Sequence, residues 1–195
     1  MKPFPFFASA LTALFLSASA ASAANLIRNG GFEQPIVPTG GFTLFGTGVT
    51  TMPHWSIVGV AGNVAIVSTT FAQSGFTFPA RSGVQWLDLT GISNSGTGVA
   101  QTVKTTAGTT YTLGFSVGNV VNTGGIFGTT STVNVFINGT QVLTATNSRG
   151  IGTSRLNWKK FTTTFVATGT STTISFINGD PSNDTLCGLD GISLQ

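Results

Sequence analysis

The chain has 195 residues, with eight Lys and Arg against five Asp and Glu, one His and one Cys. This length corresponds to a single domain, and the positive balance comes from a scarcity of acids. Lys159 and Lys160 form the only basic doublet, which argues against a nucleic-acid partner. A single cysteine excludes an intrachain disulfide, so a folded, exported form of this chain must rely on its hydrophobic core.

The first 23 residues have the organisation of a secretory signal peptide. Lys2 precedes an apolar middle over residues 4–16 and a run of small residues that ends in Ala21-Ser22-Ala23. This order predicts cleavage after Ala23. Because the apolar middle is shorter than the roughly 20 residues that cross a bilayer, we expect no membrane span. The sequence therefore predicts a signal peptide over 1–23 and one exported domain, extracellular or periplasmic, over 24–195.

The mature chain shows strand patterns and no helical ones. No segment repeats apolar residues at helical spacing, and Gly recurs too often for a stable helix. Alternating runs rich in Val, Ile, Thr and Phe predict eight strands, at 64–67, 84–89, 99–103, 110–117, 132–137, 141–145, 160–166 and 172–177. The stretches 35–51 and 119–130 are predicted to be long surface loops.

Two Asn-Gly pairs predict tight hairpin turns. Asn138-Gly139 separates VNVFI from TQVLTA, and both central residues of a type I′ turn need a positive φ. Asn178-Gly179 repeats the pair after TISFI. Eight or more short antiparallel strands in one domain predict an all-β sandwich of jelly-roll type.

Each end of the mature chain places one carboxylate, Glu33 or Asp190, in an otherwise uncharged, strand-like stretch. Alternation counted back from the C-terminus puts Asp190 on the same face as Ile192 and Leu194. If that face is buried, Asp190 is buried too. A buried carboxylate needs a cation or several hydrogen-bond donors, so Asp190 is expected to have a specific partner.

The sequence contains few side chains that could act in catalysis. A glycosidase needs two carboxylates facing each other across a cleft. With Glu33 and Asp190 at one structural site, Asp88 remains together with Asp180 and Asp184 of the turn-like GDPSND segment. There is no G-x-S-x-G nucleophile elbow to accompany the single histidine, because the one match to that string, GFSVG at 114–118, falls in the predicted strand at 110–117. We therefore expect the protein not to be an enzyme.

Carbohydrate binding has better candidates, because sugar rings stack on aromatic side chains beside polar ones. Trp86 and Asp88 lie on one face of a predicted strand, opposite Leu87 and Leu89, and Trp55 stands where a loop enters another strand. These three are the candidate carbohydrate-binding residues. The simpler interpretation is that the tryptophans are core residues and that Asp88 faces solvent.

Six motifs occur in the order of a known pattern: NLIRNGGFE, PHWSIVG, GVQWLDLTG, GVAQTVKTTAGTTYTLGFSVGN, WKKFTTTFVATGTSTTISF and GLDGISL. The chain resembles the galactose-binding-domain-like superfamily of secreted β-sandwiches. This superfamily includes bacterial choice-of-anchor domains, plant cell-wall domains of unknown function and, more distantly, carbohydrate-binding modules. The resemblance implies adjacent first and last strands, with a structural calcium held by Glu33 and Asp190. The other interpretation is an ion pair of Asp190 with Arg28.

Two functions from different classes remain. The first is a non-catalytic glycan-binding module that docks to cell-wall or matrix polysaccharide. The second is a structural or adhesive extracellular protein that contacts other proteins or associates with itself. Aromatic side chains over a groove favour the first, and a flat apolar or Thr-rich face favours the second. Cys187 is expected to be a small buried hydrophobic residue rather than a link between chains.

Overall fold

The computed structural model describes residues 1, 24–48, 52–122, 127–180 and 186–195. Except for Met1, the predicted signal peptide lies outside the described residues, as does Asp184. In the described part of the chain, no helix is long and apolar enough to cross a membrane.

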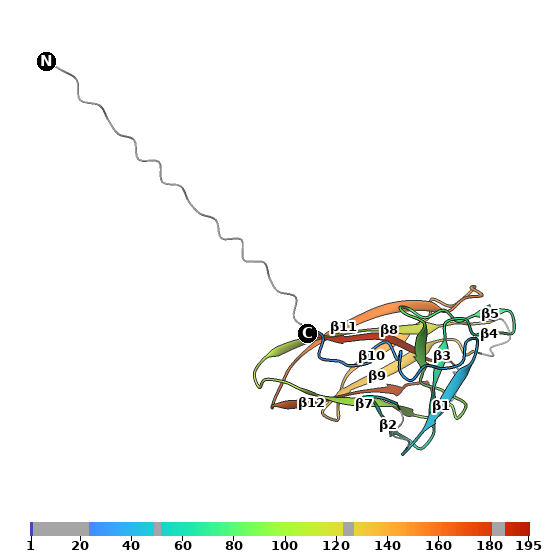
Figure 1. Cartoon of the computed structure of the whole chain (residues 1–195), viewed down its shortest axis with the longest axis horizontal. Coiled ribbons are helices and arrows are strands. Elements are labelled where there is room, and N and C mark those ends of the chain that lie inside the picture. Colours follow the sequence, from blue (N-terminus) through green and yellow to red (C-terminus); the bar gives the residue numbers. More distant parts are fainter. Residues whose placement is uncertain (2–23, 49–51, 123–126, 181–185) are drawn as a thin grey trace.

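Two antiparallel sheets form a sandwich, with β8 and β11 in one layer and β7 and β12 in the other (Figure 1). The six-stranded sheet has the order β1 (Phe42–Gly46), β3 (Asn63–Ser68), β6 (Gln85–Asp88), β13 (Gly188–Leu194), β8 (Thr110–Asn119) and β11 (Asn157–Val166). The five-stranded sheet has the order β10 (Thr140–Asn147), β9 (Ser131–Ile137), β12 (Ser171–Asn178), β7 (Thr97–Lys104) and β2 (Ser56–Gly59). A small hairpin pairs β4 (Ala72–Gln73) with β5 (Phe76–Thr77). The predicted all-β sandwich is confirmed.

All eight predicted strands are present, but one predicted loop is wrong. The stretch 35–51 contains β1, which pairs with β3 along its whole length. β1 is an edge strand in which only Phe45 is buried, so its sequence lacks the apolar alternation of the half-buried strands.

The two Asn-Gly pairs behave differently. Asn138 and Gly139 have φ values of 49° and 81°, which confirms the tight turn between β9 and β10. The second turn prediction is wrong, because neither Asn178 nor Gly179 has a positive φ. Asn178 is buried at the end of β12, and the next strand, β13, belongs to the other sheet. The chain therefore crosses between the sheets here instead of reversing within one.

The first and last segments of the domain lie together, as predicted. The Leu26 N–H donates to the Leu194 carbonyl at 2.9 Å, and the Ile192 N–H donates to the Gly30 carbonyl at 2.9 Å. The Asn25 side chain accepts from the Leu194 N–H at 2.8 Å. The N-terminal segment therefore runs against β13, which lies inside the six-stranded sheet.

The main core fills the space between the sheets and includes Leu87, Leu89, Phe115 and Phe176. The rings of Phe115 and Phe176, which come from opposite sheets, meet edge to face at 5.2 Å. Cys187 is fully buried within this core, as expected, and its thiol donates to the Thr132 carbonyl at 3.4 Å.

A second apolar cluster covers the outer face of the six-stranded sheet. Alternation along β3 and β6 sends Val67 and Trp86 away from the main core. The segment 71–80 folds over this face, and Phe78 packs there with Phe127. This cover turns a sheet face that would meet solvent into a buried layer.

Candidate functional site

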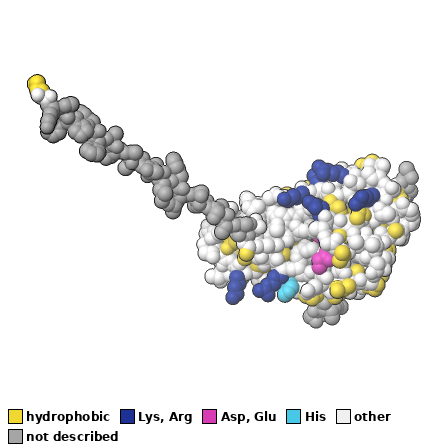
Figure 2. Space-filling model, turned by 45° about the horizontal axis from the view of Figure 1, so that its top comes forward, with side chains coloured by type: hydrophobic (Ala, Val, Ile, Leu, Met, Phe, Trp, Pro, Cys, Tyr) yellow, Lys and Arg dark blue, Asp and Glu magenta, His cyan; other side chains and the backbone are white. Residues whose placement is uncertain are grey.

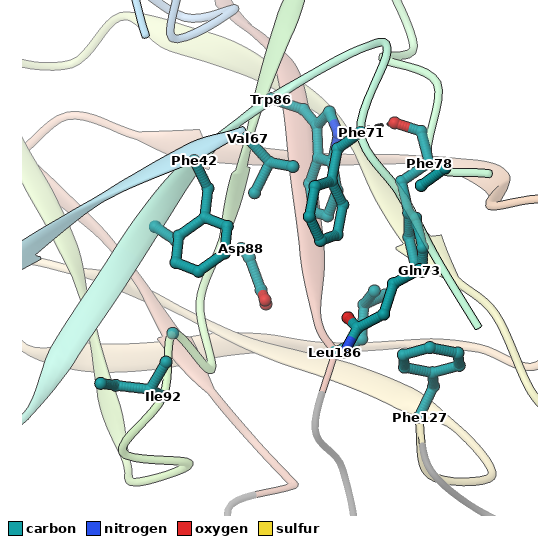
Figure 3. A pocket seen from close by; sticks show the side chains of 13 residues that line it. Phe42, Val67, Phe71, Gln73, Phe78, Trp86, Asp88, Ile92, Phe127 and Leu186 are labelled. Carbon is teal, nitrogen blue, oxygen red and sulfur yellow. Dashed lines mark hydrogen bonds between the residues drawn. The ribbon is translucent and has the colours of Figure 1, made fainter. Parts of the chain in front are cut away.

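A cavity of about 540 Å³ opens in this second layer (Figure 3). Its walls come from β1, β3 and β6, from the segment 71–78, and from four further residues that lie elsewhere in the chain, Gly91, Ile92, Phe127 and Leu186. The lining residues are Phe42, Ala65, Val67, Phe71, Ala72, Gln73, Phe78, Trp86, Asp88, Gly91, Ile92, Phe127 and Leu186.

Phenylalanine rings form a connected wall. Phe42 meets Phe71 edge to face at 5.7 Å, Phe71 meets Phe78 at 5.4 Å, and Phe78 meets Phe127 at 5.3 Å. Phe78 and Phe127 are buried, whereas Phe42 is 44% exposed and Ile92 is 70% exposed. The wall is therefore buried at Phe78 and Phe127 and accessible at Phe42, and the exposed Ile92 lies beside the opening.

Asp88 points its carboxyl group into the cavity (Figure 3). Its Oδ1 accepts hydrogen bonds from the Thr90 N–H at 3.1 Å, the Thr90 hydroxyl at 2.8 Å and the Cys187 N–H at 3.0 Å. Among the described residues, Oδ2 has no protein donor. Burial raises the pKa of Asp88 to about 6, and the three donors to Oδ1 limit the rise.

This arrangement suits binding through a ring face and one polar atom. Ionised Asp88 accepts hydrogen bonds through Oδ2, and the aromatic rings contact apolar C–H faces. Asp88 is the only carboxyl group among the described residues that line the cavity, whereas most glycosidases use a facing pair.

The structure brings two of the three predicted sugar-binding residues together and separates the third. Trp86 and Asp88 both line the cavity, whereas Trp55 packs in the main core against Phe32, with ring centroids 5.3 Å apart. Trp86 is only 1% exposed, and its indole N–H donates to the Phe78 carbonyl at 2.9 Å. Neither tryptophan is an open stacking platform.

The solvent-facing position expected for Asp88 is wrong. Asp88 does lie opposite Leu87 and Leu89, but that outer face is covered by segment 71–80. The phenylalanines of the wall were also missed from the sequence. For Phe71 and Phe78 the only signal was the spacing of aromatic residues in FAQSGFTF, over 71–78, where short strands and a turn give no clear periodicity.

A second acidic site joins Glu33 and Asp190. A Cβ atom placed on Gly31 would lie 3.6 Å from Asp190 Oδ1 and 3.8 Å from Glu33 Oε1, so both carboxylates border this glycine. Asp190 is fully buried as expected, but the alternation behind that expectation is wrong: the register of β13 shifts between Asp190 and Ser193, and Leu189, Ile192 and Leu194 all lie in the main core. Burial raises the pKa of Asp190 to about 7, and the nearby charge of Glu33 adds to the rise.

Backbone N–H groups of residues 81–85 serve both carboxylates. Asp190 Oδ2 accepts from Arg81 at 2.8 Å and from Ser82 at 3.0 Å, while Oδ1 accepts from the Gly191 N–H. Glu33 accepts from the Val84 N–H at 3.0 Å through Oε1 and at 3.2 Å through Oε2. These donors compensate buried charge without a cation.

The fit to calcium is partial. Glu33 and Asp190 supply hard oxygens from two converging side chains, but calcium takes six to eight. The described residues contain no group of three or more His, Cys, Asp or Glu side chains placed to hold a metal. Backbone carbonyls and water would have to complete the shell. Arg28 is exposed and forms no ion pair with either carboxylate in the described part of the chain, so the ion-pair interpretation is not supported.

Asp180 makes hydrogen bonds within its own loop region. Its Oδ2 accepts from the Thr130 hydroxyl at 3.4 Å, and its N–H donates to the Asn178 side-chain oxygen at 3.1 Å.

On the face in Figure 2, Lys and Arg side chains lie in separated groups with an acidic side chain between them. No continuous basic stripe is visible on that face.

A family profile described as "Protein of unknown function (DUF642)" matches residues 25–194. No curated protein matches this chain. Among solved structures, a cyclase from Fischerella sp. TAU, in complex with 4-(1H-indol-3-yl)butan-2-one, has a TM-score of 0.63 and 22% identity. The alignment covers 89% of this chain and 97% of the cyclase, and it shows a shared fold.

Two family 35 carbohydrate-binding modules are more distant. The module from an environmental isolate has a TM-score of 0.48 and 16% identity, with 78% of this chain and 92% of the module covered. The module from Clostridium thermocellum has a TM-score of 0.48 and 14% identity, with 78% and 97% covered. The two-sheet architecture is the β-sandwich fold that the resemblance implies, and the family match extends over the whole folded domain.

Proposed function

Since this chain belongs to the DUF642 family of proteins of unknown function, we propose a function from its own site: an exported, non-catalytic module that binds carbohydrate. The ligand occupies the cavity on the outer face of the six-stranded sheet, and the module docks to extracellular polysaccharide. Export rests on the leader-like pattern of residues 1–23, which precedes the folded domain.

One observation supports this function more than any other: a wall of aromatic rings faces a carboxylate that has one oxygen free for a ligand. A sugar ring has apolar C–H faces and outward hydroxyl donors. Phe42 and Phe71 at the accessible side contact the faces, and Asp88 Oδ2 accepts from a hydroxyl. A charge-assisted hydrogen bond of this kind is roughly twice as strong as a neutral one.

A structural calcium at Glu33 and Asp190 is a separate part of the proposal. The two converging carboxylates support it, and bound calcium would neutralise their mutual repulsion. It would hold the N-terminal segment to β13, away from the residues that line the cavity.

The outer face of the five-stranded sheet supports a second candidate function, a structural or adhesive role. Hydroxyl groups pair across its strands, with Thr102 and Thr173 at 2.7 Å and Thr132 and Thr146 at 3.0 Å. This polar, Thr-rich face would suit contacts with another protein or with a second copy of the chain.

Affinity electrophoresis of residues 24–195 through gels containing plant, fungal and bacterial polysaccharides tests the proposed function. We expect at least one polysaccharide to retard the protein, Asp88→Asn to abolish the retardation, and Asp180→Asn to preserve it. The second variant makes the same chemical change outside the cavity. If no polysaccharide retards the wild-type protein, the structural role replaces the binding function.

A further inference from the structure

The described residues that line the cavity offer few polar groups to a ligand. Among them, only Asp88 and Gln73 carry a polar side chain apart from Trp86, whose indole N–H is already bonded to the Phe78 carbonyl. Gln73 lies in the exposed strand β4, and its amide points into the cavity (Figure 3). In the described part of the chain, that amide has no protein hydrogen bond.

A fully hydroxylated sugar has more hydroxyl groups than the described polar side chains of this cavity can bind. Asp88 Oδ2 and the Gln73 amide can pair with about two hydroxyls, and the remaining hydroxyls of a hexose would face phenylalanine and aliphatic side chains. Each hydroxyl buried without a partner lowers affinity by about tenfold or more. A methyl group in the same place instead raises affinity, because its transfer from water to an apolar surface is favourable.

The charge of the site excludes acidic sugars. None of the described lining residues is Lys or Arg, and Asp88 is negative once ionised. The carboxylate of a uronic acid would meet Asp88 in an apolar surrounding with no cation between them. The volume of about 540 Å³ lies within the range of small-ligand sites rather than that of an open polymer groove.

We infer that the cavity recognises a neutral sugar residue with few free hydroxyls: a 6-deoxy, O-methylated or O-acetylated ring at a chain end or on a side branch. The free oxygen of Asp88 and the Gln73 amide select the remaining hydroxyls, and the phenylalanine wall receives the deoxy, methyl or acetyl group. This inference rests on the proposed carbohydrate-binding function and narrows it to one class of sugar.

Titration of the mature protein with matched methyl glycosides tests the inference. Methyl rhamnoside, methyl fucoside and a di-O-methyl glucoside are compared with methyl glucoside, methyl galactoside and methyl glucuronide by calorimetry or NMR. We expect each sugar of the first group to bind at least tenfold more tightly than methyl glucoside, and the glucuronide not to bind.

The outcomes separate the two claims. If methyl glucoside, methyl galactoside or the glucuronide binds as well as the deoxy sugars, and Asp88→Asn abolishes that binding, the function holds and the inference is overturned. If no glycoside and no polysaccharide binds, the function itself fails. Binding of indole in the cavity without any sugar also overturns both claims.

A rim variant gives an independent check. Ile92 is 70% exposed at the mouth, so Ile92→Asn should fold normally and offer a new partner to a hydroxyl. We expect the preference for methyl rhamnoside over methyl glucoside to fall at least threefold. Val142→Asn makes the same kind of change at an exposed position on β10 and should leave the preference unchanged. An unchanged preference in Ile92→Asn would contradict the inference.

Discussion

Asp88 and Asp190 lie on the neighbouring strands β6 and β13, and burial raises the pKa of both, yet their surroundings differ. Both oxygens of Asp190 accept backbone N–H groups, from Arg81, Ser82 and Gly191. Among the described residues, Asp88 accepts hydrogen bonds only through Oδ1, and its Oδ2 faces a cavity. A buried carboxylate whose two oxygens are both bonded to backbone holds the chain together, whereas one with a free oxygen is available to a ligand.

The largest expected effect is a difference between the two residues in how much an Asn substitution lowers the free energy of unfolding. Asp190→Asn turns an NH₂ group toward an N–H donor whichever way the amide lies, and we expect a loss of about 2–4 kcal/mol in the free energy of unfolding. In Asp88→Asn the amide oxygen can keep the Thr90 and Cys187 donors, so we expect a loss below about 1 kcal/mol. Urea denaturation at pH 7 measures both. A larger loss in Asp88→Asn would break the comparison.

The pH dependence of stability should carry the signature of Asp88. Its pKa is about 6 in the folded protein against 3.8 for an unperturbed aspartate, so the folded state binds more protons between these pH values. The contribution of Asp88 to the free energy of unfolding is therefore largest below about pH 4, decreases as the pH rises to about 6, and is constant at higher pH. The fall amounts to at most about 3 kcal/mol.

Asp88→Asn removes this contribution. We expect the difference in unfolding free energy, variant minus wild type, to rise between pH 4 and pH 7 by up to about 3 kcal/mol. Taking the difference cancels the titration of other groups. A constant difference across this range would show that burial does not raise the pKa of Asp88.

Ligand affinity should respond to pH in the opposite direction. Ionised Asp88 is the stronger hydrogen-bond acceptor, so we expect affinity for methyl rhamnoside to fall several-fold from pH 7.5 to pH 5. No other acidic or basic side chain lines the cavity among the described residues, and the nearby Cys187 thiol bonds to the Thr132 carbonyl instead. Affinity that rises on acidification would indicate that protonated Asp88 donates to the ligand.

Calcium should have the smallest effect, confined to the Glu33 and Asp190 site. If the ion binds only the folded state, EDTA should lower the melting temperature by a few degrees and added calcium should restore it. Glu33→Gln should reduce this response, whereas Asp88→Asn should retain it. A melting curve unchanged by EDTA would indicate that the backbone donors of residues 81–85 and Gly191 compensate these charges without a cation.

The sequence predicted what depends on local alternation. The eight predicted strands send apolar side chains toward the main core at every second position and therefore show a period of two. The burial of Asp190 did not follow from this period, because the register of β13 shifts between Asp190 and Ser193. The Asn138-Gly139 turn depends on two adjacent residues, so it was predictable as well.

Features that depend on distant segments were not predictable. Phe71 and Phe78 lie in a segment with strands of two residues each, and nothing local shows that it covers the outer face of β6. The donors to Glu33 and Asp190 are backbone N–H groups, which nearly every residue possesses and no sequence pattern marks. The covered position of Asp88 and the partners of Asp190 thus follow from tertiary structure alone.

Backbone amide NMR of the isotopically labelled mature protein during titration with methyl rhamnoside tests the central claim most directly. The account predicts the largest shifts at the amides of Thr90 and Cys187, which donate to Asp88, and at Ile92 on the rim, with little change at Arg81 and Ser82. Shifts concentrated at Arg81 and Ser82, or on the Thr102 and Thr173 face of the other sheet, would contradict it.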